Sequence, residues 1–240
     1  MIPWIQLDRV QMPGGGADLR LMRRGAEFSI MLGSNELMNS RLSGSEEALA
    51  SLACKRLRAH RSPNILIGGL GMGFTLRAAQ GELDEKSRIV VAELVPAVVA
   101  WARGPMREIF GDCLSDPRVR ILETEVGNAI RAGKAAYDAI LLDVDNGPHG
   151  LTRSANDALY GFEGLAAARA AIRPGGVLAI WSSAPDHGFS QRLKRLGFSV
   201  EEIKIRANGT RGGARHIIWL ATNGNAPHSA ARAPNSRNRD

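Results

Sequence analysis

The sequence predicts an α/β fold in which a mostly parallel sheet of seven strands carries helices on both faces. Three observations predict it. Short apolar segments alternate with helical segments from residue 64 onward. A glycine-rich turn follows the first apolar segment, and the last two apolar segments are joined by a turn with no helix between them. Alternating strands and helices favour a parallel sheet with helical crossovers. The closing pair of strands forms a hairpin, so the final strand is expected to run antiparallel.

Residues 1–44 depart from this alternation and predict a small N-terminal β-hairpin. Apolar and polar side chains alternate over 19–23 and 28–32, as in strands with one buried face. A lone hairpin is marginally stable in water, so this segment is expected to be an appendage rather than an independent domain. Residues 45–221 are expected to form the α/β domain. The tail 222–240 is expected to be disordered, because it contains almost no large apolar side chains.

The elements of the α/β domain can be assigned in chain order. Its first helix is expected from residue 45 to the helix-ending pair Ser62-Pro63. Strands are expected near residues 64–68, 88–93, 118–122, 138–143, 176–182, 198–205 and 215–221. Helices are expected between them at 74–80, 96–110, 126–132, 154–172 and 187–196. Ligands of open α/β sheets bind at the carboxyl ends of the strands, so the turns that follow these strands are the candidate sites.

The turn after the first strand predicts a nucleotide site. Its pattern Gly69-x-Gly71-x-Gly73 lets the backbone turn sharply and approach a ligand, and the N-terminus of the next helix favours an anionic or nucleoside group. Glu93 ends the following strand, about 20 residues later, at the spacing where a carboxylate accepts hydrogen bonds from ribose hydroxyls. Phe74 stands where a dinucleotide fingerprint requires a small residue. This favours an S-adenosyl nucleotide over a nicotinamide cofactor.

A second candidate is Asp143, at the end of the strand expected over 138–143. The strand is an apolar run, and a polar loop that contains glycine follows it at the same edge of the sheet. A carboxylate in this position can take a proton from an amine nucleophile or hold a cationic substrate. The alternative is that Asp143 only caps its loop, as Asp often does.

Composition limits the class of protein. Hydrophobic residues make up 44% of the 240 residues, and no apolar run is long enough to span a bilayer, so a cytoplasmic enzyme is expected. The net charge is +7, but the basic residues are scattered and no aromatic residues are interleaved with them, so nucleic acid is not expected as a partner. The two cysteines and five histidines do not pair at metal-ligand spacing, so no metal is expected.

Over about residues 18–221 the chain resembles the polyamine aminopropyltransferases, that is, the spermidine synthase family. The turn at 69–74 lies where that family has Gly-Gly-Gly-Asp-Gly-Gly, and a sheet that ends in a hairpin is typical of its class I methyltransferase-like (Rossmann-like) fold. The resemblance implies transfer of an aminopropyl group from an S-adenosyl nucleotide to an amine, in polyamine metabolism. The co-substrate would be S-adenosylmethionine or its decarboxylated form.

The resemblance also assigns roles to single residues. Glu93 matches the ribose-binding Glu, and Glu125 matches the acid that contacts the adenine amino group. Asp143 matches the general base that deprotonates the attacking amine. The second Asp of the family's loop aligns with either Asp145 or Asn146, which implies a role in binding substrate. The nucleotide-binding set implied in this way is Gly69, Gly71, Met72, Gly73, Glu93 and Glu125.

Two departures from the family pattern leave other functions open. Met72 replaces the Asp that holds the donor's aminopropyl ammonium group, and residues 47–49 replace an expected Tyr-His pair. Loss of that Asp removes a charge that would repel intact S-adenosylmethionine. The alternatives are therefore a methyltransferase acting on a small molecule, or a nucleotide-binding protein without catalysis. A small amine or another small acceptor is the expected partner, no membrane is expected, and a homodimer is left open.

Overall fold

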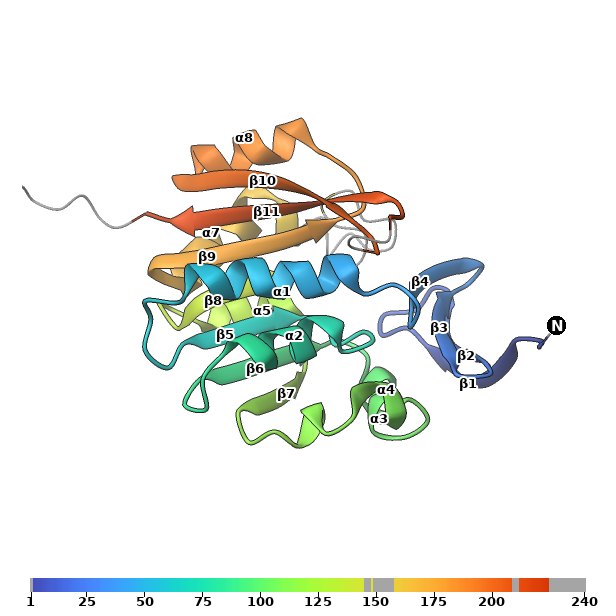
Figure 1. Cartoon of the computed structure of the whole chain (residues 1–240). Coiled ribbons are helices and arrows are strands. Elements are labelled where there is room, and N and C mark those ends of the chain that lie inside the picture. Colours follow the sequence, from blue (N-terminus) through green and yellow to red (C-terminus); the bar gives the residue numbers. More distant parts are fainter. Residues whose placement is uncertain (1, 145–147, 149–157, 209–211, 225–240) are drawn as a thin grey trace, which may run out of the picture.

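The computed structural model describes residues 2–144, 148, 158–208 and 212–224 of the chain. Figure 1 shows a small N-terminal sheet beside one edge of a larger α/β domain, at the side where the parallel strands end. No helix of the described residues is long and apolar enough to cross a membrane.

The N-terminal sheet contains four antiparallel strands in the order β1-β2-β3-β4. Their bounds are β1 (Ile5–Gln11), β2 (Asp18–Arg24), β3 (Glu27–Leu32) and β4 (Asn35–Asn39). The hairpin expected from the sequence is β2 and β3, and one further strand pairs with each of them. Leu21 and Ile30 are fully buried in the same hydrophobic cluster as the α/β domain. The additional strands and this shared cluster supply the stability that a lone hairpin lacks.

The large sheet has seven strands in the order β10-β11-β9-β8-β5-β6-β7. The bounds are β5 (Asn64–Gly68), β6 (Arg88–Glu93), β7 (Val119–Glu123), β8 (Tyr137–Leu142), β9 (Ile172–Ser182), β10 (Phe198–Arg206) and β11 (Arg215–Asn223). In the part of the sheet ordered β9-β8-β5-β6-β7, each strand is parallel to its neighbours. Strand β11 instead pairs antiparallel with both β9 and β10. The predicted mostly parallel sheet with a C-terminal hairpin is therefore confirmed.

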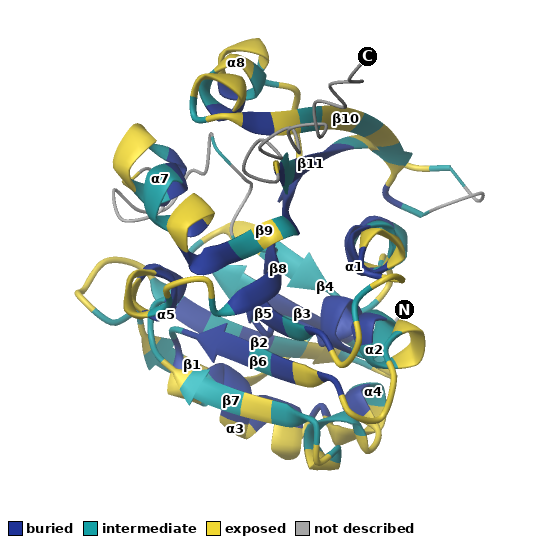
Figure 2. Cartoon of the chain, turned by 90° about the vertical axis from the view of Figure 1, so that its left-hand side faces the viewer, coloured by how far each residue is buried: buried dark blue, intermediate teal, exposed yellow. Residues whose placement is uncertain are grey.

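Helices cover both faces of this sheet. They are α1 (Gly44–Arg56), α2 (Phe74–Glu82), α3 (Pro96–Arg103), α4 (Arg107–Phe110), the 3-10 turn η1 (Cys113–Ser115), α5 (Val126–Ala132), α7 (Phe162–Ala171) and α8 (His187–Arg195). Side chains of β5 alternate between the two faces: Ile65 and Ile67 pack with α1, α2 and α3, and Leu66 packs with α5, α7 and α8. Figure 2 shows the buried residues along the strands and on the helix faces that meet them.

Several element bounds differ from those expected. Helix α1 ends at Arg56 rather than near residue 62, and strand β9 begins at Ile172 rather than at residue 176. The helix expected over 96–110 is two helices, because the chain breaks at Gly104 and Pro105, and proline cannot donate a helical hydrogen bond. The helix expected over 154–172 is α7, and residues 154–157 lie outside the described residues. Strand β11 continues to Asn223, beyond the expected boundary at 221, because its antiparallel pairing with β10 extends to the pair Phe198 and Asn223. Residues 225–240 of the expected tail also lie outside the described residues.

Candidate active site

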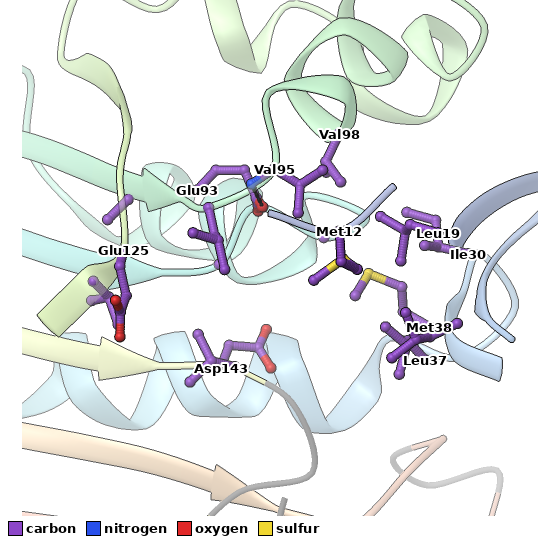
Figure 3. Close-up of a pocket in the computed structure, with 17 residues that line it drawn as sticks. Met12, Leu19, Ile30, Leu37, Met38, Glu93, Val95, Val98, Glu125 and Asp143 are labelled. Carbon is purple, nitrogen blue, oxygen red and sulfur yellow. Dashed lines mark hydrogen bonds between the residues drawn. The ribbon is translucent and has the colours of Figure 1, made fainter. Parts of the chain in front are cut away.

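A pocket lies between the N-terminal sheet and the carboxyl edge of the large sheet, and it encloses about 820 Å³ including its open mouth. Figure 3 shows Glu93, Glu125 and Asp143 on the α/β side of the pocket. Apolar side chains from the N-terminal region form the opposite side: Met12, Leu19, Ile30, Leu32, Leu37 and Met38. The three acids predicted from the sequence are therefore brought into one pocket.

The glycine turn shapes this pocket through its backbone. Gly69, Gly71 and Gly73 all have positive φ, at 89°, 51° and 75°. A Cβ atom on Gly69 would lie 2.6 Å from the carbonyl oxygen of Asp143, so the turn can approach the end of β8 only without a side chain. Gly69 and Gly71 line the pocket. Gly73 instead faces the ring of Phe110, which a Cβ atom would approach to 2.5 Å, so its role here is in packing.

Glu93 holds the turn in place. One carboxylate oxygen accepts the backbone N–H of Leu70 at 2.8 Å, and the other accepts the backbone N–H of Val95 at 2.8 Å. Its side chain is buried, and this burial raises its pKa although the two N–H donors act in the opposite direction. A carboxylate offers about four lone-pair sites, so the two that remain can accept ribose hydroxyls.

Glu125 reaches the pocket from the residue before α5. Its side chain makes no capping hydrogen bond to that helix, and its carboxylate has no hydrogen-bond partner among the described residues. It lines the same pocket as Glu93, which ends the neighbouring strand β6. A partly exposed acceptor in this position fits an exocyclic amino group of a base.

Asp143 directly follows β8 and is held by the end of β5 and by α2. Its backbone N–H donates to the Gly68 carbonyl at 3.1 Å, and the Thr75 hydroxyl donates to its carboxylate at 2.7 Å. Burial, and then the negative charge of Glu46, raise its pKa to about 7, although the hydrogen bond from Thr75 acts in the opposite direction. A carboxyl with this pKa can accept a proton near neutral pH.

Beyond Asp143 lies a second, smaller cavity. Met72 lines this cavity and not the first one, and its side chain is 3% exposed. The predicted substrate-binding residues, Asp145 and Asn146, lie outside the described residues.

Comparison with known proteins identifies relatives of this chain. It is 27% identical over 151 residues to polyamine aminopropyltransferase 1 of Streptomyces coelicolor, and 30% identical over 129 residues to the polyamine aminopropyltransferase of Mycobacterium tuberculosis. These alignments include 59% and 52% of the chain but 27% and 23% of the relatives. The chain thus spans about a quarter of the length of the curated relatives it matches. No protein-family model matches it.

Solved structures share the fold. Spermidine synthase from Thermotoga maritima matches with a TM-score of 0.70 at 18% identity, covering 93% of this chain and 74% of that one. A spermidine synthase in complex with the transition-state analogue AdoDATO gives the same values. A probable spermidine synthase from Corynebacterium glutamicum matches with a TM-score of 0.62 at 15% identity, covering 95% and 83%. The chain is spermidine-synthase-like in sequence and in fold. This confirms the resemblance that the motifs indicated.

Sequence motifs did not identify three residues of this candidate site. They are Glu46 in α1, Thr75 in α2 and Trp181 at the end of β9. Glu46 carries a weak signal, since it is acidic, but acidic residues are common in the first turn of a helix because they interact favourably with the helix dipole. Thr75 and Trp181 carry no signal that separates them from core residues.

The raised pKa of Asp143 predicts that Asp143→Asn stabilises the spermidine-synthase-like fold at alkaline pH. The carboxyl titrates at 3.8 when unfolded and at about 7 when folded, so the folded protein binds the proton more tightly, and stability falls as pH rises through this window. Asn has no charge to bury, so the variant should gain about 2–4 kcal/mol at pH 8.5 and little near pH 4.5. Urea unfolding at both pH values measures the gain. Glu47→Gln, which removes an exposed charge, is the control. An equal gain at both pH values would contradict the assignment.

Proposed function

We propose that this protein transfers an aminopropyl group from decarboxylated S-adenosylmethionine to a small amine. The observation that carries the proposal is the carboxyl of Asp143, whose pKa is raised to about 7 and which lines the same pocket as Glu93 and Glu125. The names of the sequence relatives, polyamine aminopropyltransferases, support the same reaction class.

The two glutamates bind and orient the nucleoside in this proposal. Ribose hydroxyls donate to the lone pairs of Glu93 that the backbone leaves available, and the adenine amino group donates to Glu125. Apolar side chains of the N-terminal sheet, such as Met38 and Ile30, cover the nucleoside and exclude water. Exclusion of water strengthens the electrostatic interactions within the pocket.

Asp143 acts as the base. The lone pair of the amine nitrogen attacks the aminopropyl methylene carbon that is bonded to the sulfonium sulfur. The bond between this carbon and sulfur breaks, and its electrons move to sulfur. The amine proton passes to the carboxylate of Asp143, and a neutral thioether leaves. The hydrogen bond from Thr75, at 2.7 Å, fixes the carboxylate in position.

A second candidate is methyl transfer from intact S-adenosylmethionine. The observation that favours it is Met72, whose neutral side chain lines the second cavity where the family pattern has a carboxylate. The third hypothesis, a nucleotide-binding protein without catalysis, predicts binding and no product. The three hypotheses differ in the donor that binds and in the product that forms.

Calorimetry with the two nucleotides, followed by mass spectrometry of a reaction with 1,4-diaminobutane, tests the proposal. We expect the decarboxylated nucleotide to bind at least about tenfold more tightly, because the carboxylate of the intact one would face acidic side chains. We also expect an aminopropylated amine and 5′-methylthioadenosine as products. A methylated amine with S-adenosylhomocysteine would establish the second candidate instead. Tight binding of nucleotide without product, across a panel of amines, would establish the third.

A further inference from the structure

The second cavity adjoins the nucleotide pocket and contains a carboxylate that the proposed reaction does not use. We call it the acid cavity and define it by Glu46, Met72, Phe74, Asp143 and Trp181, which line it. It shares Asp143 with the nucleotide pocket, so the two spaces meet at the proposed base.

Glu46 is fixed on the side of the acid cavity formed by α1. The Ser45 hydroxyl donates to its carboxylate at 2.7 Å, and His216 Nδ1 lies 3.0 Å from the same hydroxyl oxygen. The Ser45 hydroxyl has one proton, and it donates that proton to Glu46. In the contact with His216 the hydroxyl oxygen must therefore accept, so we assign the ring hydrogen of His216 to Nδ1. Burial lowers the pKa of His216, so this histidine is neutral near pH 7 and brings no positive charge to Glu46.

The two carboxylates of the acid cavity are electrostatically unfavourable as an ionised pair. Burial raises the pKa of Glu46, and the charge of Glu46 contributes to the raised pKa of Asp143. No Lys or Arg of the described residues lines the cavity. Two neighbouring carboxylates in a cavity without a basic side chain either share a proton or bind a positively charged group of a ligand.

The remaining walls indicate what kind of ligand would enter. Met72 and Phe74 are buried apolar side chains that can pack against methylene groups. Trp181 is 9% exposed, and its indole N–H has no hydrogen-bond partner among the described residues. The Trp181 ring lies edge-to-face against His216, with the ring centroids 4.8 Å apart, so it closes this side of the cavity with an aromatic surface.

We propose that the acid cavity binds a primary ammonium group at the end of a short aliphatic chain, and that Glu46 selects for it. The methylenes pack on Met72 and Phe74, and the ammonium group lies at the carboxylates of Glu46 and Asp143. Glu46 thereby supplies from α1 the negative charge that Met72 does not supply from the glycine turn. The ammonium group belongs to the tail of the decarboxylated donor or to the far end of a diamine acceptor, so this inference rests on the proposed function.

The test is Glu46→Gln in the full chain, with Glu47→Gln as the matched control, since Glu47 is the exposed neighbour on the same helix turn. Calorimetry measures three ligands: decarboxylated S-adenosylmethionine, 5′-methylthioadenosine, which has the nucleoside but no ammonium group, and 1,4-diaminobutane added to protein saturated with 5′-methylthioadenosine. We expect Glu46→Gln to weaken at least one ammonium ligand by about tenfold or more and to change 5′-methylthioadenosine by less than about twofold. Glu47→Gln should change none.

The arms of this experiment separate its outcomes. A loss for the decarboxylated nucleotide assigns the ammonium group to the donor tail, and a loss for the diamine assigns it to the acceptor. Unchanged affinity for both ammonium ligands would overturn the proposal, as would an equal loss for 5′-methylthioadenosine, which would make Glu46 a structural residue. Failure of the proposed function gives a different result from failure of this inference. In that case the parent protein would form no product, but Glu46→Gln would still bind the ammonium ligands more weakly than the parent protein.

Discussion

Replacement of Asp143 by Asn is expected to lower turnover by about 10²–10⁴-fold while nucleoside affinity changes by less than about threefold. Asn has nearly the shape of Asp, and its amide oxygen can still accept the hydrogen bond that Thr75 donates at 2.7 Å. It cannot accept the proton of the amine. Single-turnover kinetics measure the chemical step, and calorimetry with 5′-methylthioadenosine measures the affinity.

The pH dependence distinguishes a base from a structural residue at this position. A base acts only when deprotonated, so kcat/KM of the parent protein should fall as pH decreases below about 7, the pKa of Asp143. Asp143→Asn should lose this limb of the profile, and Glu47→Gln should retain it. A variant that keeps the limb, or that loses nucleoside affinity along with turnover, would contradict the role of Asp143 as the base.

Replacement of Glu93 by Ala is expected to weaken both nucleotide binding and the fold. The carboxylate accepts the backbone N–H groups of Leu70 and Val95, both at 2.8 Å, and its removal leaves two donors without their acceptor. Each such loss costs about 1–3 kcal/mol, so a total of about 2–6 kcal/mol is expected in the free energy of unfolding. Urea unfolding measures this change, and calorimetry with 5′-methylthioadenosine measures the loss of binding.

Glu125→Ala is the matched control, because its carboxylate lines the same pocket without a hydrogen-bond partner among the described residues. It should weaken nucleoside binding by about 1–3 kcal/mol and change stability by less than about 0.5 kcal/mol. If Glu93→Ala were as stable as Glu125→Ala, the glycine turn would not depend on Glu93. If both variants bound 5′-methylthioadenosine as tightly as the parent, the nucleotide site would be misassigned.

Much of the nucleotide side of the site could be predicted from local sequence. Gly69 and Asp143 directly follow strands of the sheet, Glu93 ends one, and the carboxyl ends of parallel strands meet at one edge. Their meeting in one pocket therefore follows from strand order and alternation alone. The roles implied for Gly73 and Met72 were less predictable, because the same turn places one against Phe110 and the other in the acid cavity.

The opposite wall and the charge balance of the site were decided by the tertiary structure. Met12 and Met38 enter the nucleotide pocket only because the N-terminal sheet packs on the α/β domain, and no local pattern encodes that docking. Glu46 lies about 100 residues before Asp143, and only the packing of α1 beside the sheet brings the two charges together. The sequence by itself determined which carboxylate stands at the strand end. Burial and the neighbouring charge of Glu46, which exist only in the folded chain, raised the pKa of this carboxyl to about 7.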